Sequence, residues 1–107
     1  MGGSGYLCST LSRALADAGS RVGVLDAAEP DTPRPGLPPA DLEYLRCDVT
    51  SKTELIRCRD RMIRTHGRVD ILLNGAGANA PTPFFEITEQ ETARIIGVNL
   101  VGVLHSC

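Results

Sequence analysis

An α/β fold with a doubly wound parallel sheet is predicted by the alternation of short apolar runs with amphipathic stretches along the 107-residue chain. The run Val69–Leu73 is nearly continuous, which is typical of a strand buried on both faces. Residues 21–26 and 42–47 are two further runs of strand length. The length fits one domain, residues 1–107, and we find no internal repeat or linker.

Amphipathic stretches with recognisable ends predict the helices. The first follows the opening glycines and ends at Gly19, a residue typical of a helix C-terminus. Capping boxes at Ser51-x-x-Glu54 and Thr88-x-x-Glu91 predict the starts of two more. The apolar faces are expected to be Leu7, Leu11, Ala14, Leu15 and Ala18 in the first helix, Leu55, Cys58 and Met62 in the second, and Ile96, Leu100, Val103 and Leu104 in the third. The proline-rich residues 27–39 favour a short helix or a loop.

A glycine-rich loop opens the chain and predicts a phosphate-binding turn. The helix and strand that follow this loop end in Asp26, about twenty residues beyond the glycines, which is the spacing of the dinucleotide-binding fingerprint. Glycines let a pyrophosphate approach the backbone, and the helix N-terminus offers unpaired N–H groups. The candidate binding residues of this loop are Gly2, Gly3, Ser4, Gly5, Tyr6 and Leu7.

A second loop of small residues follows the strand expected at residues 69–73. It comprises Asn74, Gly75, Ala76 and Gly77, and small residues at the carboxyl end of a parallel strand let a flat ligand lie against the backbone. The alternative is an ordinary glycine-rich turn after a strand. The presence of both glycine loops favours the ligand site.

These motifs together resemble the amino-terminal half of a short-chain dehydrogenase/reductase. Gly2, Gly5 and position 8 match the spacing TGxxGxxG of part of that family, with Met1 in place of Thr and Cys8 in place of the third glycine. The second loop matches the family's NNAG-type motif, over residues 74–77. The pair Asp48-Val49 matches the family's adenine-side Asp-Val.

The resemblance implies a Rossmann-like fold and an NAD(P)-dependent oxidoreductase that transfers a hydride between nicotinamide and an alcohol or ketone. The Cys8 position and the loop at 78–81 also resemble those of sugar-acid or polyol dehydrogenases. Asp26 would hydrogen-bond the adenosine ribose and repel a 2′-phosphate, so we expect NAD(H) in preference to NADP(H). The intact protein would be a homo-oligomer.

Residues that the family needs for catalysis are missing from the sequence. Neither Tyr6 nor Tyr44 is followed by the lysine of a Tyr-x-x-x-Lys pair, and the family's first strand would precede Met1. Without that central strand, the strands at 21–26 and 69–74 would lie roughly 10 Å apart, twice the strand spacing. We therefore expect an incomplete sheet and a fragment that is loosely packed and inactive alone. The alternative function is a non-catalytic dinucleotide-binding or interaction module.

Three polar residues have both a functional and a structural interpretation. Asp26 could be a turn residue after a strand, and Asp48 could cap the helix that follows it. Asn99 stands where the family has its catalytic asparagine, but a buried amide could equally bond the backbone of a neighbouring element. We expect Asn99 to be buried in a bent helix with an ordered water.

Composition and charge exclude several other functions. A net charge of −2 without a basic stripe argues against nucleic-acid binding. The four cysteines show no C-x-x-C or other metal-like spacing, and neither histidine has a partner in sequence. No apolar run approaches the ~20 residues of a membrane span. Reduced thiols and the lack of a signal peptide favour a cytoplasmic protein with a small-molecule substrate and no metal.

Overall fold

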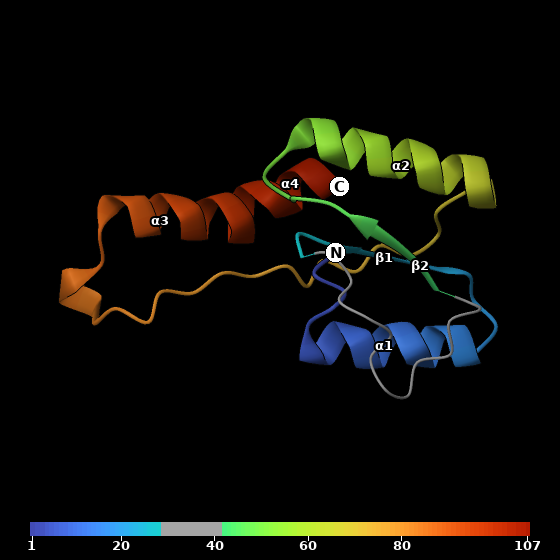
Figure 1. Cartoon of the computed structure of the whole chain (residues 1–107), viewed down its shortest axis with the longest axis horizontal. Helices are drawn as coiled ribbons and strands as arrows, with labels where there is room; N and C mark the ends of the chain where they lie inside the picture. The colour runs from blue at the N-terminus through green and yellow to red at the C-terminus, as the bar shows by residue number, and fades with distance from the viewer. Residues whose placement is uncertain (29–41) are drawn as a thin grey trace.

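A computed structural model describes residues 1–28 and 42–107, and it places helices on both sides of a small parallel sheet (Figure 1). Helix α1 lies on one side of the sheet, whereas α2 and α4 lie on the other. The elements are α1 (Tyr6–Asp17), β1 (Val22–Asp26), β2 (Leu42–Arg46), α2 (Lys52–His66), the 3₁₀ turn η1 (Phe84–Glu86), α3 (Glu89–Ile96), the π-helical turn η2 (Gly97–Val101) and α4 (Gly102–Ser106). Most of the proline-rich stretch, for which we expected a short helix or loop, lies outside the described residues.

The strands β1 and β2 confirm two of the three predicted runs. They pair in parallel, in a register that runs from Val22 opposite Leu42 to Asp26 opposite Arg46. The Cys47 N–H donates to the Asp26 carbonyl at 2.8 Å, which continues the pairing by one residue. Both strands therefore deliver their last residues to the same edge of the sheet.

The prediction of a third strand at 69–73 is wrong, because this segment is extended but belongs to no ladder among the described residues. The Met1 ammonium donates to the Leu73 carbonyl at 2.6 Å, and the Gly75 N–H donates to the Met1 carbonyl at 2.9 Å. Further along, the Gly3 N–H donates to the Leu25 carbonyl at 3.1 Å. Residues 1–3 thus bridge β1 and the extended segment at one end, so the expected gap is filled at the carboxyl edge.

At the N-terminal end of the 69–73 segment, Val69 and Ile71 are 54% and 59% exposed. A strand requires a neighbour with matching N–H and C=O groups. Within the described residues, residue 1 supplies the backbone groups that pair with this segment.

Helix α1 ends as predicted but turns a different face inward. The Gly19 N–H donates to the Ala16 carbonyl at 2.8 Å and the Ser20 N–H to the Leu15 carbonyl at 3.0 Å, a Schellman motif with Gly19 at φ +87°. Leu7 and Leu11 are 73% and 48% exposed, which contradicts the expected apolar face.

The inward positions of α1 carry smaller side chains instead. Ser12 is buried, and Cys8 contacts Gly75 so closely that a Cβ on this glycine would lie 2.0 Å from the Cys8 Sγ atom. The Cys8 side chain fills the space above Gly75, which leaves no room for a larger side chain at either position. The predicted face was therefore wrong because the helix packs at its small residues.

Helix α2 begins at the predicted cap and covers the sheet with the predicted face. The Ser51 hydroxyl accepts from the Glu54 N–H, but the Glu54 carboxylate accepts from the Asp48 N–H, so the capping box is only half formed. Leu55 and Cys58 are buried with Cys47 in the core cluster.

The other part of the α2 face lies over β1. A Cβ on Gly23 would be 2.4 Å from the Met62 methyl group, so the glycine makes room for this side chain. The predicted contribution of Met62 to the inward face is in accord with this contact.

Helix α3 starts at its predicted capping box and continues into the wider π-helical turn η2. Thr88 and Glu91 form both reciprocal hydrogen bonds, as predicted. A π-helical turn, η2, interrupts the helix in the region where a bend was expected. Leu100 and Leu104 are 52% and 67% exposed, so the predicted apolar face is wrong. The helix contacts the rest of the protein at Gly102, where a Cβ would lie 2.8 Å from a Val49 methyl group.

No helix within residues 1–28 and 42–107 is both long and apolar enough to cross a bilayer.

Candidate functional site

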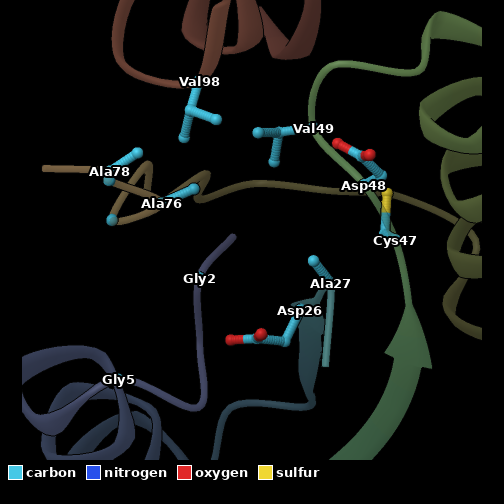
Figure 2. A pocket seen from close by; sticks show the side chains of 12 residues that line it. Gly2, Gly5, Asp26, Ala27, Cys47, Asp48, Val49, Ala76, Ala78 and Val98 are labelled. Atoms are coloured by element: carbon cyan, nitrogen blue, oxygen red, sulfur yellow. The ribbon is translucent and has the colours of Figure 1, made fainter. Parts of the chain in front are cut away.

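A cavity of about 310 Å³ lies at the carboxyl edge of the sheet, where both glycine loops and the ends of both strands meet (Figure 2). The predicted residues that line it are Gly2, Gly5, Asp26, Asp48, Val49, Gly75, Ala76 and Gly77. Segments about seventy residues apart in sequence are thus brought together around one space, as expected of a ligand site at this edge.

Several lining residues were missed and several predicted ones lie elsewhere. The missed residues are Ala27, Cys47, Ala78 and Val98. The first three are adjacent in sequence to the predicted site residues Asp26, Asp48 and Gly77 and could have been found by extending the motifs by one residue. Val98 comes from η2, and no sequence signal placed it. The predicted residues outside the cavity wall are Gly3, Ser4, Tyr6, Leu7, Asn74 and Asn99.

The two glycine loops touch through their backbones. Gly2 has φ +64°, in the region that favours glycine, and a Cβ there would lie 2.5 Å from the Ala76 nitrogen. A Cβ on Gly3 would be 2.6 Å from a Val24 methyl group. The loops therefore form a surface that carries no side chain larger than a methyl group, which a flat or phosphorylated ligand can approach.

The N-terminus of α1 adds an electrostatic preference for anions. Gly5 caps the helix without a side-chain hydrogen bond, and the first turn carries no acidic residue. The first N–H groups and the positive end of the helix dipole therefore favour a negatively charged group. Tyr6 and Leu7 are 88% and 73% exposed, so in this structure their side chains contribute to the surface of α1.

Asp26 links the end of β1 to the first glycine loop. Its Oδ2 accepts from the Ser4 N–H at 3.0 Å and its Oδ1 from the Ala28 N–H at 3.1 Å. The bond to Ala28 is the turn contact of the structural interpretation, and the cavity position fits the functional one. The parallel register also brings Arg46 opposite Asp26, and the Arg46 Nε donates to the Ala27 carbonyl at 3.4 Å.

Asp48 is held in a turn at the end of β2. Its Oδ1 accepts from the Thr50 hydroxyl at 2.7 Å and from the Thr50 N–H at 2.8 Å. These hydrogen bonds, the hydroxyl first, lower the pKa of the Asp48 carboxyl from its ordinary value. The Asp48 carboxylate thus accepts hydrogen bonds within this turn, whereas the Ser51 side chain caps α2. The capping role considered for Asp48 therefore belongs to Ser51.

The side chains of Asn99 and Asn74 make hydrogen bonds between segments, Asn99 to the backbone of Ala78 and Asn74 to Ser106 of α4. The Asn99 Oδ1 accepts from the Ala78 N–H at 2.7 Å, and its Nδ2 donates to the Ala78 carbonyl at 3.0 Å. Asn99 is exposed, so the expected burial is wrong because η2 lies at the surface. The Asn74 Oδ1 accepts from the Ser106 hydroxyl at 2.8 Å, which fixes the second loop to α4.

The cysteines and acidic residues of the described chain provide no metal centre. All four cysteines are free thiols, and no group of three potential ligands occurs within the described residues. Burial and a hydrogen bond to Cys58 raise the pKa of the Cys47 thiol to about 12. This cavity residue is thus a neutral thiol near neutral pH.

The sequence matches the short chain dehydrogenase family over residues 1–107. The chain belongs to the short-chain dehydrogenases. It is 34% identical over 96 residues to an uncharacterized short-chain type dehydrogenase/reductase of Sinorhizobium fredii, a match that covers 85% of this chain and 38% of the relative. The chain thus spans well under two thirds of this relative's length.

Solved short-chain dehydrogenases have the same arrangement. The enzyme of Leptospira borgpetersenii with bound NAD⁺ is 29% identical, with a TM-score of 0.83 over 97% of this chain and 40% of that one. The ligand-free aldohexose dehydrogenase of Thermoplasma acidophilum is 26% identical, with a TM-score of 0.79 over 94% of this chain and 36% of that one. The incomplete Rossmann-like fold predicted from the sequence is therefore confirmed.

Proposed function

We propose that this chain is the cofactor-binding half of an NAD(H)-dependent short-chain oxidoreductase. The observation that carries the proposal is the position of Asp26, whose carboxylate lines the cavity and accepts from the N–H of Ser4 in the glycine loop. A carboxylate at the end of the second Rossmann strand suits the two ribose hydroxyls of NAD and repels a 2′-phosphate.

The remaining residues fit the other parts of a dinucleotide. The side-chain-free contact between Gly2 and Ala76 and the uncapped start of α1 suit a pyrophosphate. Asp48 and Val49 would face the adenine, and Gly75 to Gly77 would lie along the nicotinamide ribose. The bound nicotinamide would supply the hydride chemistry, whereas this chain would bind and orient the cofactor.

Catalysis would need groups that this sequence does not contain. In a short-chain dehydrogenase of full length, a tyrosine acts as general acid/base and a lysine lowers its pKa, so we propose that residues 1–107 alone have no turnover. Asn99 would be the one catalytic residue within the chain, and its two hydrogen bonds to Ala78 support at least a role in fixing the loop. The substrate would be an alcohol or ketone.

The narrower proposal of a sugar acid or polyol rests on the loop at 78–81, and the similarity to an aldohexose dehydrogenase supports it. The free thiols support a cytoplasmic location, and a homo-oligomer is proposed from the family.

Cofactor titrations followed by NMR test the proposal on a protein restored to full length, because residues 1–107 alone are expected to be loosely packed. NAD(H) should bind more tightly than NADP(H), with shifts confined to the cavity residues. The double variant Asp26→Ala/Ala27→Arg should reverse the order, because it exchanges repulsion for a charge-assisted hydrogen bond to phosphate. Asp17→Ala, at the far end of α1, is the matched control for loss of one negative charge.

Arg46→Met measures what the positive charge opposite Asp26 contributes to cofactor affinity. This variant should leave the preference for NAD(H) unchanged. Tighter binding of NADP(H) by the unmodified chain would contradict the assignment. An absence of shifts with either cofactor, in a folded chain, would favour the interaction module instead.

A further inference from the structure

The loop at residues 78–82 lies along α3 and η2 and is hydrogen-bonded to η2 at Ala78 and to α3 at Asn79 and Thr82. Figure 1 shows this extended segment running beside the helix in the opposite direction. Ala78 bonds Asn99, the Asn79 carbonyl accepts from the Arg94 Nη2 at 2.7 Å, and the Thr82 hydroxyl donates to Glu91 at 2.5 Å. The loop is therefore antiparallel to the helix.

The spacing of these contacts matches the geometry of the two elements. Four extended residues, from 78 to 82, span about 13 Å, and eight helical residues, from 91 to 99, span about 12 Å. The π-helical turn is wider than an α-turn and rotates Asn99 back toward the side of the helix that carries Glu91. The match in length lets all three contacts form between the two elements.

Arg94 differs from the other two helix residues in that it takes no part in the α3 cap or in η2, although its charge also acts on Glu91. Glu91 also completes the capping box of α3, and Asn99 belongs to η2, so changing either one disturbs the helix itself. The Arg94 guanidinium reaches the middle of the loop, next to the point where the Asn79 side chain accepts from the Ala80 N–H. Its loss would remove the middle contact and loosen the loop, while the contacts at Ala78 and Thr82 and the cap of α3 stay in place.

We infer that Arg94 is a positioning residue that holds the 78–82 loop against α3 and thereby fixes Ala78 and the small-residue wall of the cavity. Ala78 lines the cavity and joins the wall at 75–77 to this loop. The inference deepens the proposed function and rests on it for the nature of the ligand. The opposing interpretation is an exposed arginine whose surface hydrogen bond contributes little.

Amide hydrogen exchange of the full 107-residue chain, followed by NMR, tests this role independently of the cofactor. Arg94→Met removes the donors and keeps an apolar stem, and Arg94→Lys restores one donor. Arg64→Met makes the same change on α2 and is the matched control. Arg94→Met should speed exchange of the Ala78 amide by about ten-fold, on the order of one lost charge-assisted hydrogen bond, and Lys should recover part of this.

The affinity for NAD⁺, titrated on the same samples, should fall several-fold in Arg94→Met and recover in Arg94→Lys. An unprotected Ala78 amide in the unmodified chain, or equal exchange in Arg94→Met, would overturn the inference. Faster exchange with unchanged affinity would also overturn it. If no sample binds NAD⁺, the proposed function fails, and the exchange data with the lysine rescue still decide whether Arg94 positions the loop.

Discussion

The contact between the two glycine loops gives a sharp prediction for Gly2→Ala. An alanine at this position would have to adopt φ +64°, and its Cβ would lie 2.5 Å from the Ala76 nitrogen and 2.7 Å from the Gly75 carbonyl carbon. The left-handed conformation costs about 1–2 kcal/mol for a residue with a Cβ. The contact adds to this because backbone atoms, unlike a flexible side chain, must move with their whole loop.

Gly19→Ala separates the cost of the left-handed conformation from the cost of the close contact in their effects on the free energy of unfolding. Gly19 has φ +87°, and a Cβ there meets nothing within 4 Å, so this variant bears the conformational cost alone. We expect Gly2→Ala to destabilise the chain by at least about 1 kcal/mol more than Gly19→Ala, in line with strained sites elsewhere. Urea unfolding followed by circular dichroism measures both values.

NAD⁺ titration should show a loss of affinity in Gly2→Ala only, because only this glycine lines the cavity. Equal destabilisation by the two variants would mean that the loops separate at little cost. The account of a ligand surface with no side chain larger than a methyl group would then be wrong.

Two further predictions concern titratable groups. The hydroxyl of Thr82, and then the backbone and hydroxyl of Thr88, lower the pKa of Glu91 from its ordinary value of 4.5. A lowered folded-state pKa means that this stabilisation is complete above the ordinary value and is lost as the pH falls through the folded value, so helix content on acid titration should fall less in Glu91→Gln than in the unmodified chain. Because the pKa of Cys47 is raised to about 12, its alkylation at pH near 8 should be far slower than that of exposed Cys107, as peptide mass spectrometry would reveal. Equal rates at the two thiols would indicate that the core around Cys47 opens readily.

The candidate site was largely predictable because its signals are local. Gly2, Gly5 and Asp26 follow a fixed spacing, and the capping box at Thr88 and Glu91 is a local pattern that the structure reproduces. Short-range patterns of this kind report backbone conformation directly, since glycine conformations and helix caps involve only neighbouring residues. The parallel α/β class follows equally from the order of the elements.

Tertiary packing alone decided which faces of α1 and of the last helix are buried and which segments pair. Cys8 and Gly102, not the leucines, mark where α1 and α4 meet the rest of the protein, because these tight contacts leave room only for small residues, regardless of hydrophobic period. The segment at 69–73 has strand-like residues, yet pairing depends on a neighbour that supplies matching backbone groups. Likewise, only the parallel register brought Arg46 opposite Asp26, and only the wide turn of η2 brought Asn99 to Ala78. The sequence by itself thus determined the fold class and the residues of the two glycine loops, whereas long-range contacts decided which segments these loops meet.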